Sequence, residues 1–255
     1  MINVNDKNFR HFSMPIHNPP YEPREVNFRG DIFSIGYKVK RPDIIAGIVP
    51  SPLVYMGDEL KMALNVVKEL KAGFPKGAPV WNEISIQIPV IYEGQPTDYI
   101  VEIYSSDIVA IMFDREVFGL PRVPGRVSVE RDENGVRAKL TDFYNGKEMV
   151  GLNFQFLDRP PQGPPSIKRR KVFLKYIPSP DLTNTADVKK LLEMKYGRPT
   201  IQKMLTGNGS IELLESAPSY LKEAGIGEVT ESLYIDIELN CLGASVIHNY
   251  KESNK

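Results

Sequence analysis

The segment REVFGLPRVPG, residues 115–125, contains charged side chains whose spacing could support chemistry. Arg122 lies between two prolines, whose rings restrict the backbone on both sides of it. A guanidinium fixed in this way can bind a substrate carboxylate through two hydrogen bonds. The alternatives are a structural ion pair, with Glu83 or Glu116 as partner, or an arginine at the surface.

Glu83 begins a segment, residues 83–92, in which isoleucines alternate with polar residues. Alternation puts Glu83, Ser85 and Gln87 on one face of a strand and the isoleucines on the other. If the apolar face packs against other elements, the polar face lines an interior. Burial there raises the pKa of a carboxyl group and suits Glu83 to general acid or base catalysis. The alternative is a polar face in contact with solvent.

Other charged residues have simpler interpretations. Arg115 and Glu116 follow an apolar run, and a structural role in the loop is favoured for this pair. Lys175 could supply an amine, but its alternation with neighbouring apolar residues favours a strand lysine whose ammonium group reaches solvent. Lys139 is expected to be solvated. The three histidines have no metal-binding spacing, and two of them lie in a polar N-terminal region.

Composition excludes several classes of protein. Lysine plus arginine and aspartate plus glutamate balance at 32 each, so no global field would attract nucleic acid or an anionic membrane. One cysteine, Cys241, excludes an internal disulfide and is typical of a reducing compartment. The chain contains no P-loop, no GxGxxG after a strand and no GxSxG. We expect no cofactor and no metal. With no apolar run near 18 residues and no signal peptide, we expect a cytoplasmic protein.

Most predicted elements are strands. Strands are expected over 28–37, 84–92, 99–104 and 108–113, then in two hairpins between 126 and 157, and again from 172, over 232–239 and over 244–250. Helices are expected over 42–49, 186–194 and 217–223, and hairpin-like segments near residues 207–209. Residues 58–71 fit either a helix or a strand. The proline-rich segment 158–166 is a loop.

These elements indicate an α+β fold with a large antiparallel sheet. Many sequential strands close most easily into a barrel or a strongly curved sheet, which hides their edges. The proline-rich loop is more consistent with a connection inside one sheet than with a domain linker. We therefore predict a single domain over residues 1–255, with residues 1–25 as an irregular N-terminal arm.

Three segments in order, NEISIQIPVIYEGQPTDYIVEIY, REVFGLPRVPG and FLKYIPSPD, resemble the acetoacetate decarboxylase family. The resemblance extends from about residue 26 to the C-terminus. It implies a cone-like antiparallel β-barrel with peripheral helices, and a homo-oligomer. It also implies a small carboxylic acid as the ligand. From the balanced charge, we expect neither nucleic acid nor a membrane as a partner.

In this family a lysine after the motif proline forms a Schiff base with a β-keto acid. Its amine is activated by a desolvated, cationic pocket. The resemblance places that lysine at Arg122, and a guanidinium is not an amine nucleophile. It also places a family arginine at Gly30, beside Arg29, and a family glutamate at Ala63. Glu83, Arg115 and Glu116 match the family pattern. Because a one-residue offset changes the face of a strand, Arg29 can replace the arginine only if a bulge intervenes.

The resemblance and the residues together suggest a lyase-type enzyme acting on a small keto or enol acid in a barrel cavity. Glu83 would be the catalytic residue, and Arg122, Arg115, Glu116 and Arg29 would bind substrate. No Schiff base is expected at residue 122. One alternative is a non-catalytic small-acid-binding or degenerate family member. Another is a true acetoacetate decarboxylase that uses a different lysine.

Overall fold

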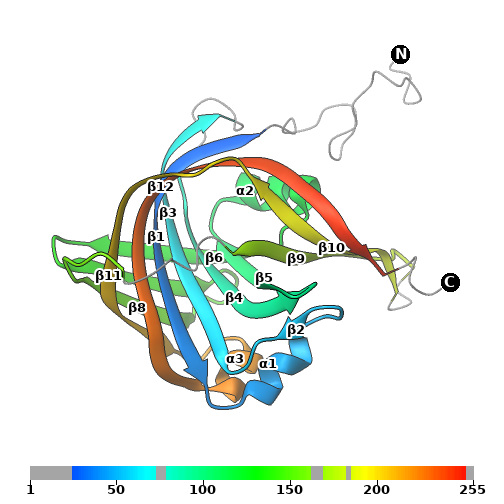
Figure 1. Ribbon diagram of the computed structural model, residues 1–255, viewed down its shortest axis with the longest axis horizontal. Helices are drawn as coiled ribbons and strands as arrows, with labels where there is room; N and C mark the ends of the chain where they lie inside the picture. Colours follow the sequence, from blue (N-terminus) through cyan, green and yellow to red (C-terminus); the bar gives the residue numbers. More distant parts are fainter. Residues whose placement is uncertain (1–24, 73–78, 162–168, 182–184, 251–255) are drawn as a thin grey trace.

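The computed structural model describes residues 25–72, 79–161, 169–181 and 185–250, so almost all of the predicted N-terminal arm lies outside it (Figure 1). The strands are β1 (Val26–Val39), β2 (Val54–Tyr55), β3 (Glu59–Ala72), β4 (Asn82–Tyr92), β5 (Gln95–Ser105), β6 (Arg122–Arg131), β7 (Gly135–Asp142), β8 (Glu148–Phe156), β9 (Arg170–Pro178), β10 (Ala186–Tyr196), β11 (Thr200–Leu213) and β12 (Ile226–Asn249). The helices are α1 (Pro42–Ile48), α2 (Ile108–Phe113), the π-helical turn η1 (Asp114–Phe118) and α3 (Ser219–Ala224).

All the strands belong to one 12-stranded sheet whose order is β10-β9-β5-β6-β7-β8-β11-β12-β1-β3-β4-β2. Two further pairings, β10 with β12 and β5 with β4, close the strands into cycles. Most neighbours are antiparallel, but β5 pairs in parallel with both β6 and β9. The prediction of a large antiparallel sheet is therefore confirmed apart from the parallel pairings of β5, and the fold is mostly sheet with few helices.

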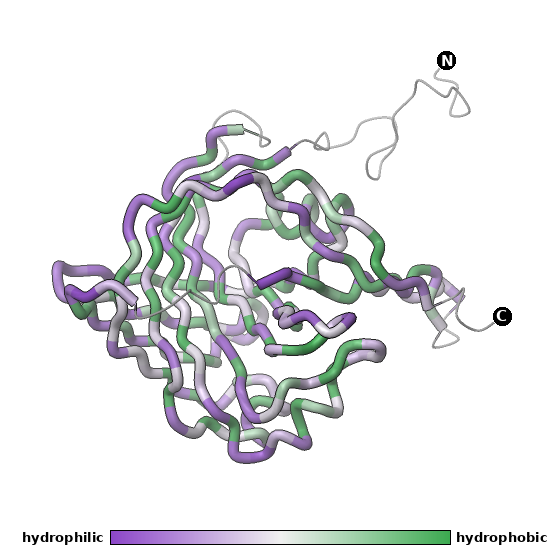
Figure 2. The backbone as a smooth tube through the Cα atoms, viewed as in Figure 1, coloured by the Kyte–Doolittle hydropathy of each residue, from purple (hydrophilic) through white to green (hydrophobic). Residues whose placement is uncertain are grey.

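The long strands β1, β3 and β4, labelled in Figure 1, have the main core on one face and a second interior on the other. One face of each carries the main hydrophobic core, which packs against β6, β7, β8 and the helices α1 and α3. Leu60, Met62 and Leu64 of β3 and Ile84, Ile86 and Ile88 of β4 lie in this core and are fully buried. The alternate residues of the same strands point to the other interior. The alternation is visible along these strands in Figure 2.

Several predicted elements are confirmed. The helix expected over 42–49 is α1, which has a proline in its first turn. The two hairpins expected between 126 and 157 are β6–β7–β8, paired antiparallel in sequence. The ambiguous segment 58–71 is the strand β3, because both of its edges pair with neighbouring strands. The helix expected over 217–223 is α3.

Two predictions of element type are wrong. Residues 108–113 form the helix α2, not a strand, because the side chain of Asp107 caps the helix by accepting a hydrogen bond from Ala110 N at 2.6 Å. Residues 186–194 form the strand β10, not a helix. This strand is paired on one edge with β9 and on the other with β12, and these ladders outweigh the helical propensity of the segment.

The C-terminal region has fewer and longer strands than predicted. The two strands expected over 232–239 and 244–250 are one continuous strand, β12, of 24 residues. The hairpin-like segments near Gly207 and Gly209 are part of one strand, β11. Both glycines allow close approach: a Cβ atom at Gly207 would lie 2.2 Å from the Phe154 ring. Among the described residues, no helix combines the length and apolar character needed to cross a membrane.

Candidate active site

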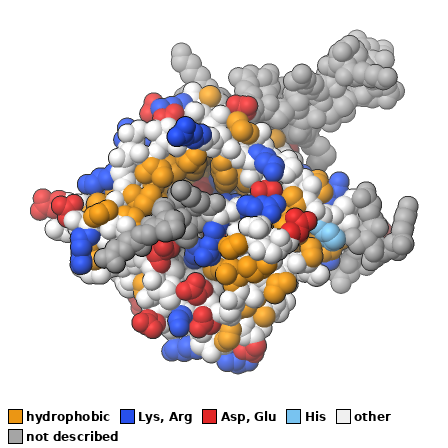
Figure 3. Space-filling model, in the orientation of Figure 1, with side chains coloured by type: hydrophobic (Ala, Val, Ile, Leu, Met, Phe, Trp, Pro, Cys, Tyr) orange, Lys and Arg blue, Asp and Glu red, His pale blue; other side chains and the backbone are white. Residues whose placement is uncertain are grey.

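A cavity of about 620 Å³ lies within the cycle of strands β5, β9, β10, β12, β1, β3 and β4. Its lining combines apolar side chains with charged ones, and it includes Glu83, Ser85 and Gln87. The polar face of β4 thus lines an interior, as one of the two sequence interpretations required. Figure 3 shows a hollow near the centre of this face of the molecule, between hydrophobic and charged side chains.

A second groove, of about 740 Å³, lies over the ends of β6, β7, β8 and β11. It is the larger of the two, but its charged residues Glu130, Arg131, Asp132 and Arg137 are all exposed. The cavity, in contrast, holds buried ionisable groups, whose chemistry the protein can alter most strongly. We therefore place the candidate active site in the cavity.

Arg122 is the first residue of β6 and is held by its backbone from several sides. It lies opposite Ile103 in the parallel ladder between β5 and β6. Its amide donates to Leu120 O at 2.8 Å, and its carbonyl oxygen accepts a hydrogen bond from Arg115 Nη1 at 2.8 Å. The backbone position from which the Arg122 side chain extends is consequently fixed. The side chain points into the cavity, and only 5% of the residue is exposed.

The Arg122 guanidinium binds two carboxylates of the protein itself. Nη1 donates to Glu83 Oε2 at 2.5 Å, and Nε pairs with Asp114. The Trp81 ring lies beside the guanidinium, with its centroid 5.7 Å from Cζ. Burial opposes the charge on Arg122, but Asp114 and Glu83 outweigh it and raise its pKa further. Arg122 is therefore a permanent cation between two carboxyl groups.

Glu83 is the most firmly positioned member of this cluster. Its Oε2 atom also accepts a hydrogen bond from Trp81 Nε1 at 2.8 Å, and its Oε1 atom accepts one from Asn65 Nδ2 at 3.0 Å. Both oxygens are therefore oriented, one by Asn65 of β3 and the other by Trp81, which precedes β4, and by Arg122 of β6. A carboxylate whose orientation is fixed in a mostly apolar cavity is suited to proton transfer with a bound ligand.

Asp114 is a member of the site that the sequence did not predict. It lies at the junction of α2 and η1, where its backbone carbonyl accepts hydrogen bonds from the amides of Gly119 and Leu120. Burial raises its pKa to about 6, with a further increase from Glu83 and an opposing effect of Arg122. The segment before it was expected to be a strand, and only the helix α2 brings Asp114 next to Arg122.

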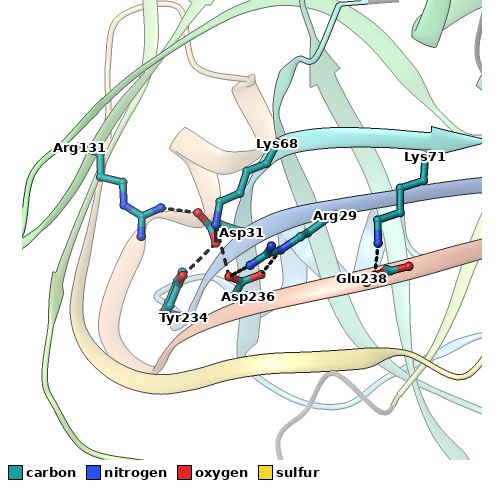
Figure 4. Close-up of polar contacts among 8 residues, drawn as sticks. All are labelled: Arg29, Asp31, Lys68, Lys71, Arg131, Tyr234, Asp236 and Glu238. Atoms are coloured by element: carbon teal, nitrogen blue, oxygen red, sulfur yellow. Dashed lines mark hydrogen bonds and ion pairs between the residues drawn. The ribbon is translucent and has the colours of Figure 1, made fainter. Parts of the chain in front are cut away.

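Three residues predicted to bind substrate do not line the cavity. Arg115 supports the backbone of Arg122, and the Glu116 carbonyl oxygen accepts a hydrogen bond from Lys175 Nζ at 3.1 Å. Arg29 binds Asp236 through two hydrogen bonds, of 3.1 and 2.9 Å, in an ion-pair cluster with Lys68, Asp31 and Arg131 (Figure 4). A register shift follows Arg29 in its pairing with β3, but it does not bring the side chain into the cavity.

Gly30 and Ala63, the other two positions compared with the family, carry no chemical group. A Cβ atom at Gly30 would lie 2.7 Å from Val66 O on β3, so no side chain fits there without movement of the backbone. Ala63 lines the cavity, on the same face of β3 as Lys61 and Asn65. This face of β3 is where the structure reveals a second charged group of residues.

That second group surrounds Lys61, which the sequence analysis did not identify. Lys61 is only 5% exposed and lies 3.5 Å from Asp98 Oδ1. Lys171 Nζ donates to Asp98 Oδ2 at 2.5 Å and to Gln87 Oε1 at 2.8 Å, and Arg169 Nη1 lies 3.6 Å from Asp98 Oδ1. Burial lowers the pKa of Lys61; Asp98 opposes this effect, and Lys171 and Arg169 add to it.

The alternating pattern of β3 could have identified Lys61. Leu60, Met62 and Leu64 alternate with Lys61, Ala63 and Asn65, the pattern of a strand with an apolar and a polar face. The lysine that did attract attention, Lys175, lies outside the cavity, and its stem packs over Gly119. Lys61 rather than Lys175 is the buried lysine of this site.

The cavity also contains two groups that are neutral near pH 7. Burial raises the pKa of the Cys241 thiol to about 12, so the nucleophilic thiolate is not populated. Burial also raises the pKa of the Tyr196 hydroxyl well above its usual value, although 40% of the residue is exposed. The Tyr196 hydroxyl can therefore donate a hydrogen bond. The charged side chains of the site are those of the Arg122 cluster and those around Lys61.

Comparison with known proteins identifies the family. The model of the family described as acetoacetate decarboxylase (ADC) matches residues 13–251. The chain belongs to the acetoacetate decarboxylase family. It is 24% identical to the acetoacetate decarboxylase of Ralstonia nicotianae, over 94% of this chain and 95% of that protein. It is also 24% identical to that of Clostridium acetobutylicum, over 97% and 99% of the two chains.

Solved structures share the fold. Acetoacetate decarboxylase from Legionella pneumophila superposes with a TM-score of 0.82 at 22% identity, over 94% of this chain and 95% of that one. The enduracididine biosynthesis enzyme MppR, solved in complex with pyruvate, superposes with a TM-score of 0.77 at 15% identity, over 94% and 98%. The fold is thus shared by proteins named for different activities, and the site must indicate what this family member does.

Proposed function

We propose that this member of the acetoacetate decarboxylase family acts on a small keto or enol acid in its cavity. The reaction is of the lyase type and uses no imine at residue 122. The observation that carries the proposal is the Glu83–Arg122–Asp114 cluster, which faces a largely apolar cavity. A cone-like closed β-barrel around this cavity is part of the proposal, and the cycles of strand pairing support it.

The cluster is suited to moving a proton. Arg122 stays charged and holds both carboxyl groups in place, and the raised pKa of Asp114, about 6, lies close to neutral pH. A group with such a pKa can both accept and return a proton under cellular conditions. Glu83, oriented by Trp81 and Asn65, is the residue we assign to proton transfer with the ligand.

The structure changes the role that we assign to Arg122. Two of its nitrogens, Nη1 and Nε, already bind Glu83 and Asp114, so the guanidinium is not a free fork for a substrate carboxylate. We therefore propose that Arg122 is a positioning residue for the two carboxyl groups. The substrate carboxylate would bind other cations that line the cavity.

Ligand-dependent thermal unfolding tests whether the cavity binds small acids. Pyruvate, acetoacetate and 2-oxoglutarate are compared, and a ligand at about 100 times its Kd adds about 2.7 kcal/mol to the free energy of unfolding. We expect at least one keto acid to raise the Tm, and the increase to be smaller in a Glu83→Gln variant. No increase with any of the three acids would contradict the proposal. Binding without turnover would favour the non-catalytic alternative.

The position of Lys61 favours a second candidate function, imine chemistry through a lysine other than one at residue 122. Its pKa is lowered by burial and by the nearby cations Lys171 and Arg169, which increases the fraction of neutral amine. A neutral amine can attack the carbonyl carbon of a keto acid. Uptake of one proton and loss of one water then leave a protonated imine, which accepts the electron pair when the carbon–carboxylate bond breaks and carbon dioxide leaves.

Reductive trapping tests this second candidate. The protein is treated with acetoacetate and sodium borohydride, which reduces an imine to a stable secondary amine, and the modified peptide is mapped by mass spectrometry. The candidate predicts an adduct on Lys61 that is absent in Lys61→Arg and retained in Lys171→Arg. An unmodified protein, or an adduct on another lysine, would contradict it.

A further inference from the structure

The cavity has two charged ends with different balances of charge. At one end, the single cation Arg122 binds the two carboxyl groups of Glu83 and Asp114. At the other end the balance is reversed. Lys61, Lys171 and Arg169 share the single carboxylate of Asp98. We call this second group the cationic end. Cations exceed carboxylates there even when Lys61 is neutral.

Asp98 does not satisfy all three cations. Its Oδ2 atom accepts a short hydrogen bond from Lys171, whereas Lys61 and Arg169 lie 3.5 and 3.6 Å from Oδ1, too far for strong bonds. Arg169 Nη1 is buried and has no hydrogen-bond partner within the described part of the chain. A buried donor without a partner is costly, and an anion in the cavity would remove that cost.

Nearby carboxylates do not neutralise the cationic end. Glu193 of β10 also lines the cavity, but Arg170 holds it through two hydrogen bonds of 2.9 Å, and Lys195 lies 3.0 Å away. Glu231 of β12 acts on Lys61 more weakly than Asp98 does. Burial alone would raise the pKa of Asp98, but the charges of Lys171 and Lys61 outweigh burial and lower it. Asp98 is therefore ionised, and its negative charge is the single carboxylate charge already included in the balance of the cationic end.

The two ends are too far apart for a very small acid to contact both. Glu83 belongs to the first end, and Gln87, which binds Lys171, belongs to the second. Both lie on one face of β4, four residues apart, which corresponds to about 13 Å between their backbones at about 3.3 Å per residue. The cavity volume of about 620 Å³ is within the range of sites for considerably larger ligands.

We propose that the cationic end binds a distal carboxylate, so that the substrates are elongated dicarboxylic keto acids. This inference rests on the proposed function and specifies its substrate class. The carbonyl carbon lies near Glu83 and Asp114, and the second carboxylate accepts hydrogen bonds from Arg169, Lys171 and Lys61. The otherwise unpartnered Arg169 Nη1 then gains a charged acceptor.

Calorimetric titration with matched pairs of linear acids tests this inference. Each pair has one chain length and differs only in the second carboxylate: butanoate with succinate, hexanoate with adipate, and octanoate with octanedioate. We expect the diacid of at least one pair to bind at least tenfold more tightly than its monoacid. Equal affinities within all three pairs would overturn the inference, whereas they would leave the proposed function intact if the monoacids bind.

Two independent variants connect the preference to the cationic end. Lys171→Gln and Arg169→Gln should each reduce the ratio of diacid to monoacid affinity at least fivefold. Lys139→Gln, an exposed lysine on β7, is the control and should retain the ratio. A ratio that is unchanged in a folded Lys171→Gln or Arg169→Gln variant would contradict the assignment. If no acid of either class binds, the inference fails, and thermal unfolding with the three keto acids decides the proposed function separately.

Discussion

At the scale of single residues, the account depends on one buried cation between two carboxyl groups. Removing one partner of a buried ion pair is costly because the remaining charge is left without compensation. Arg122→Met should therefore lower the free energy of unfolding by about 3–5 kcal/mol at pH 7. The loss should be smaller at pH 5, where Asp114, whose pKa burial raises to about 6, binds a proton more readily. Urea unfolding at both pH values measures this, and Arg126→Met, an exposed position on the same strand, should have little effect.

Asp114 should impose a characteristic pH dependence on stability. Its pKa is raised from 3.8 to about 6 in the folded protein, so the folded state binds more protons than the unfolded state between these values. Stability from this group is complete below about pH 3.8 and is lost as the pH rises to 6, by roughly 3 kcal/mol at 1.36 kcal/mol per pKa unit.

The variant Asp114→Asn removes this titration. The difference in unfolding free energy between the wild type and the variant should fall as the pH rises from 4 to 6, and urea denaturation at four pH values measures it. Asp58→Asn, at an exposed carboxylate, should show no such trend. A difference that does not change with pH would mean that Asp114 is ionised throughout this range.

The residues of the site differ in how far the sequence could predict them. Glu83 and Arg122 were predicted as candidates, and an ion pair between them was one of the alternatives considered. The types and spacing of residues could not show that the same arginine also binds Asp114. That contact depends on the turn of η1, which is stabilised by hydrogen bonds from Gly119 and Leu120 to the Asp114 carbonyl oxygen.

At the scale of elements, the turn between η1 and β6 sets the direction of Arg122. Gly119 has a φ of 81°, and a Cβ atom there would lie 2.6 Å from Lys175 Cδ. Gly119→Ala should therefore lower the free energy of unfolding by about 2 kcal/mol or more, because the backbone is strained and the added methyl group clashes with the Lys175 side chain. Gly94 has a similar φ of 74°, but a Cβ atom there would have no other atom within 4 Å. Gly94→Ala should therefore lower the free energy of unfolding through backbone strain alone.

A double variant separates the two contributions. Adding Lys175→Ala to Gly119→Ala removes the stem, so the combined loss should be smaller than the sum of the two single losses. Thermal or urea unfolding of the four proteins measures this difference. Additive losses would show that Lys175 does not oppose a side chain at residue 119.

The elements show why local patterns are incomplete predictors. The alternation over β4 and the turn residues of the β6–β7–β8 hairpins are local signals, and both were interpreted correctly. Residues 108–113 form a helix because of the Asp107 cap, a single side chain that an apolar run does not reveal. Residues 186–194 form a strand because β9 and β12 pair with both of its edges, and β12 is distant in sequence.

At the scale of the whole molecule, the cavity exists because β10 and β12 pair and complete a cycle of strands. Beyond Cys241, β12 has β10 as its pairing partner and no longer pairs with β1. Val246, paired with Leu192, lies in this part. Val246→Pro removes an amide donor from the ladder, and it should reduce ligand-induced stabilisation by more than half while the main core remains folded.

The control for this prediction is Val246→Thr, which keeps the amide and a β-branched side chain. Near-ultraviolet circular dichroism monitors the aromatic core formed by Phe33, Phe154 and Tyr234, which lies on the other side of β1. Unchanged ligand stabilisation in Val246→Pro would show that the cavity does not depend on this pairing.

The central claim is that Glu83 and Asp114, held by Arg122, transfer a proton to and from a keto acid in the cavity. Exchange of the α-hydrogens of 2-oxoglutarate and acetoacetate in D₂O, followed by proton NMR, measures that transfer whether or not a bond to carbon breaks. The account predicts exchange faster than in buffer for at least one of the acids, and a loss of about 100-fold or more in Glu83→Gln. Exchange at the buffer rate with both acids, or equal rates in the wild type and Glu83→Gln, would contradict it.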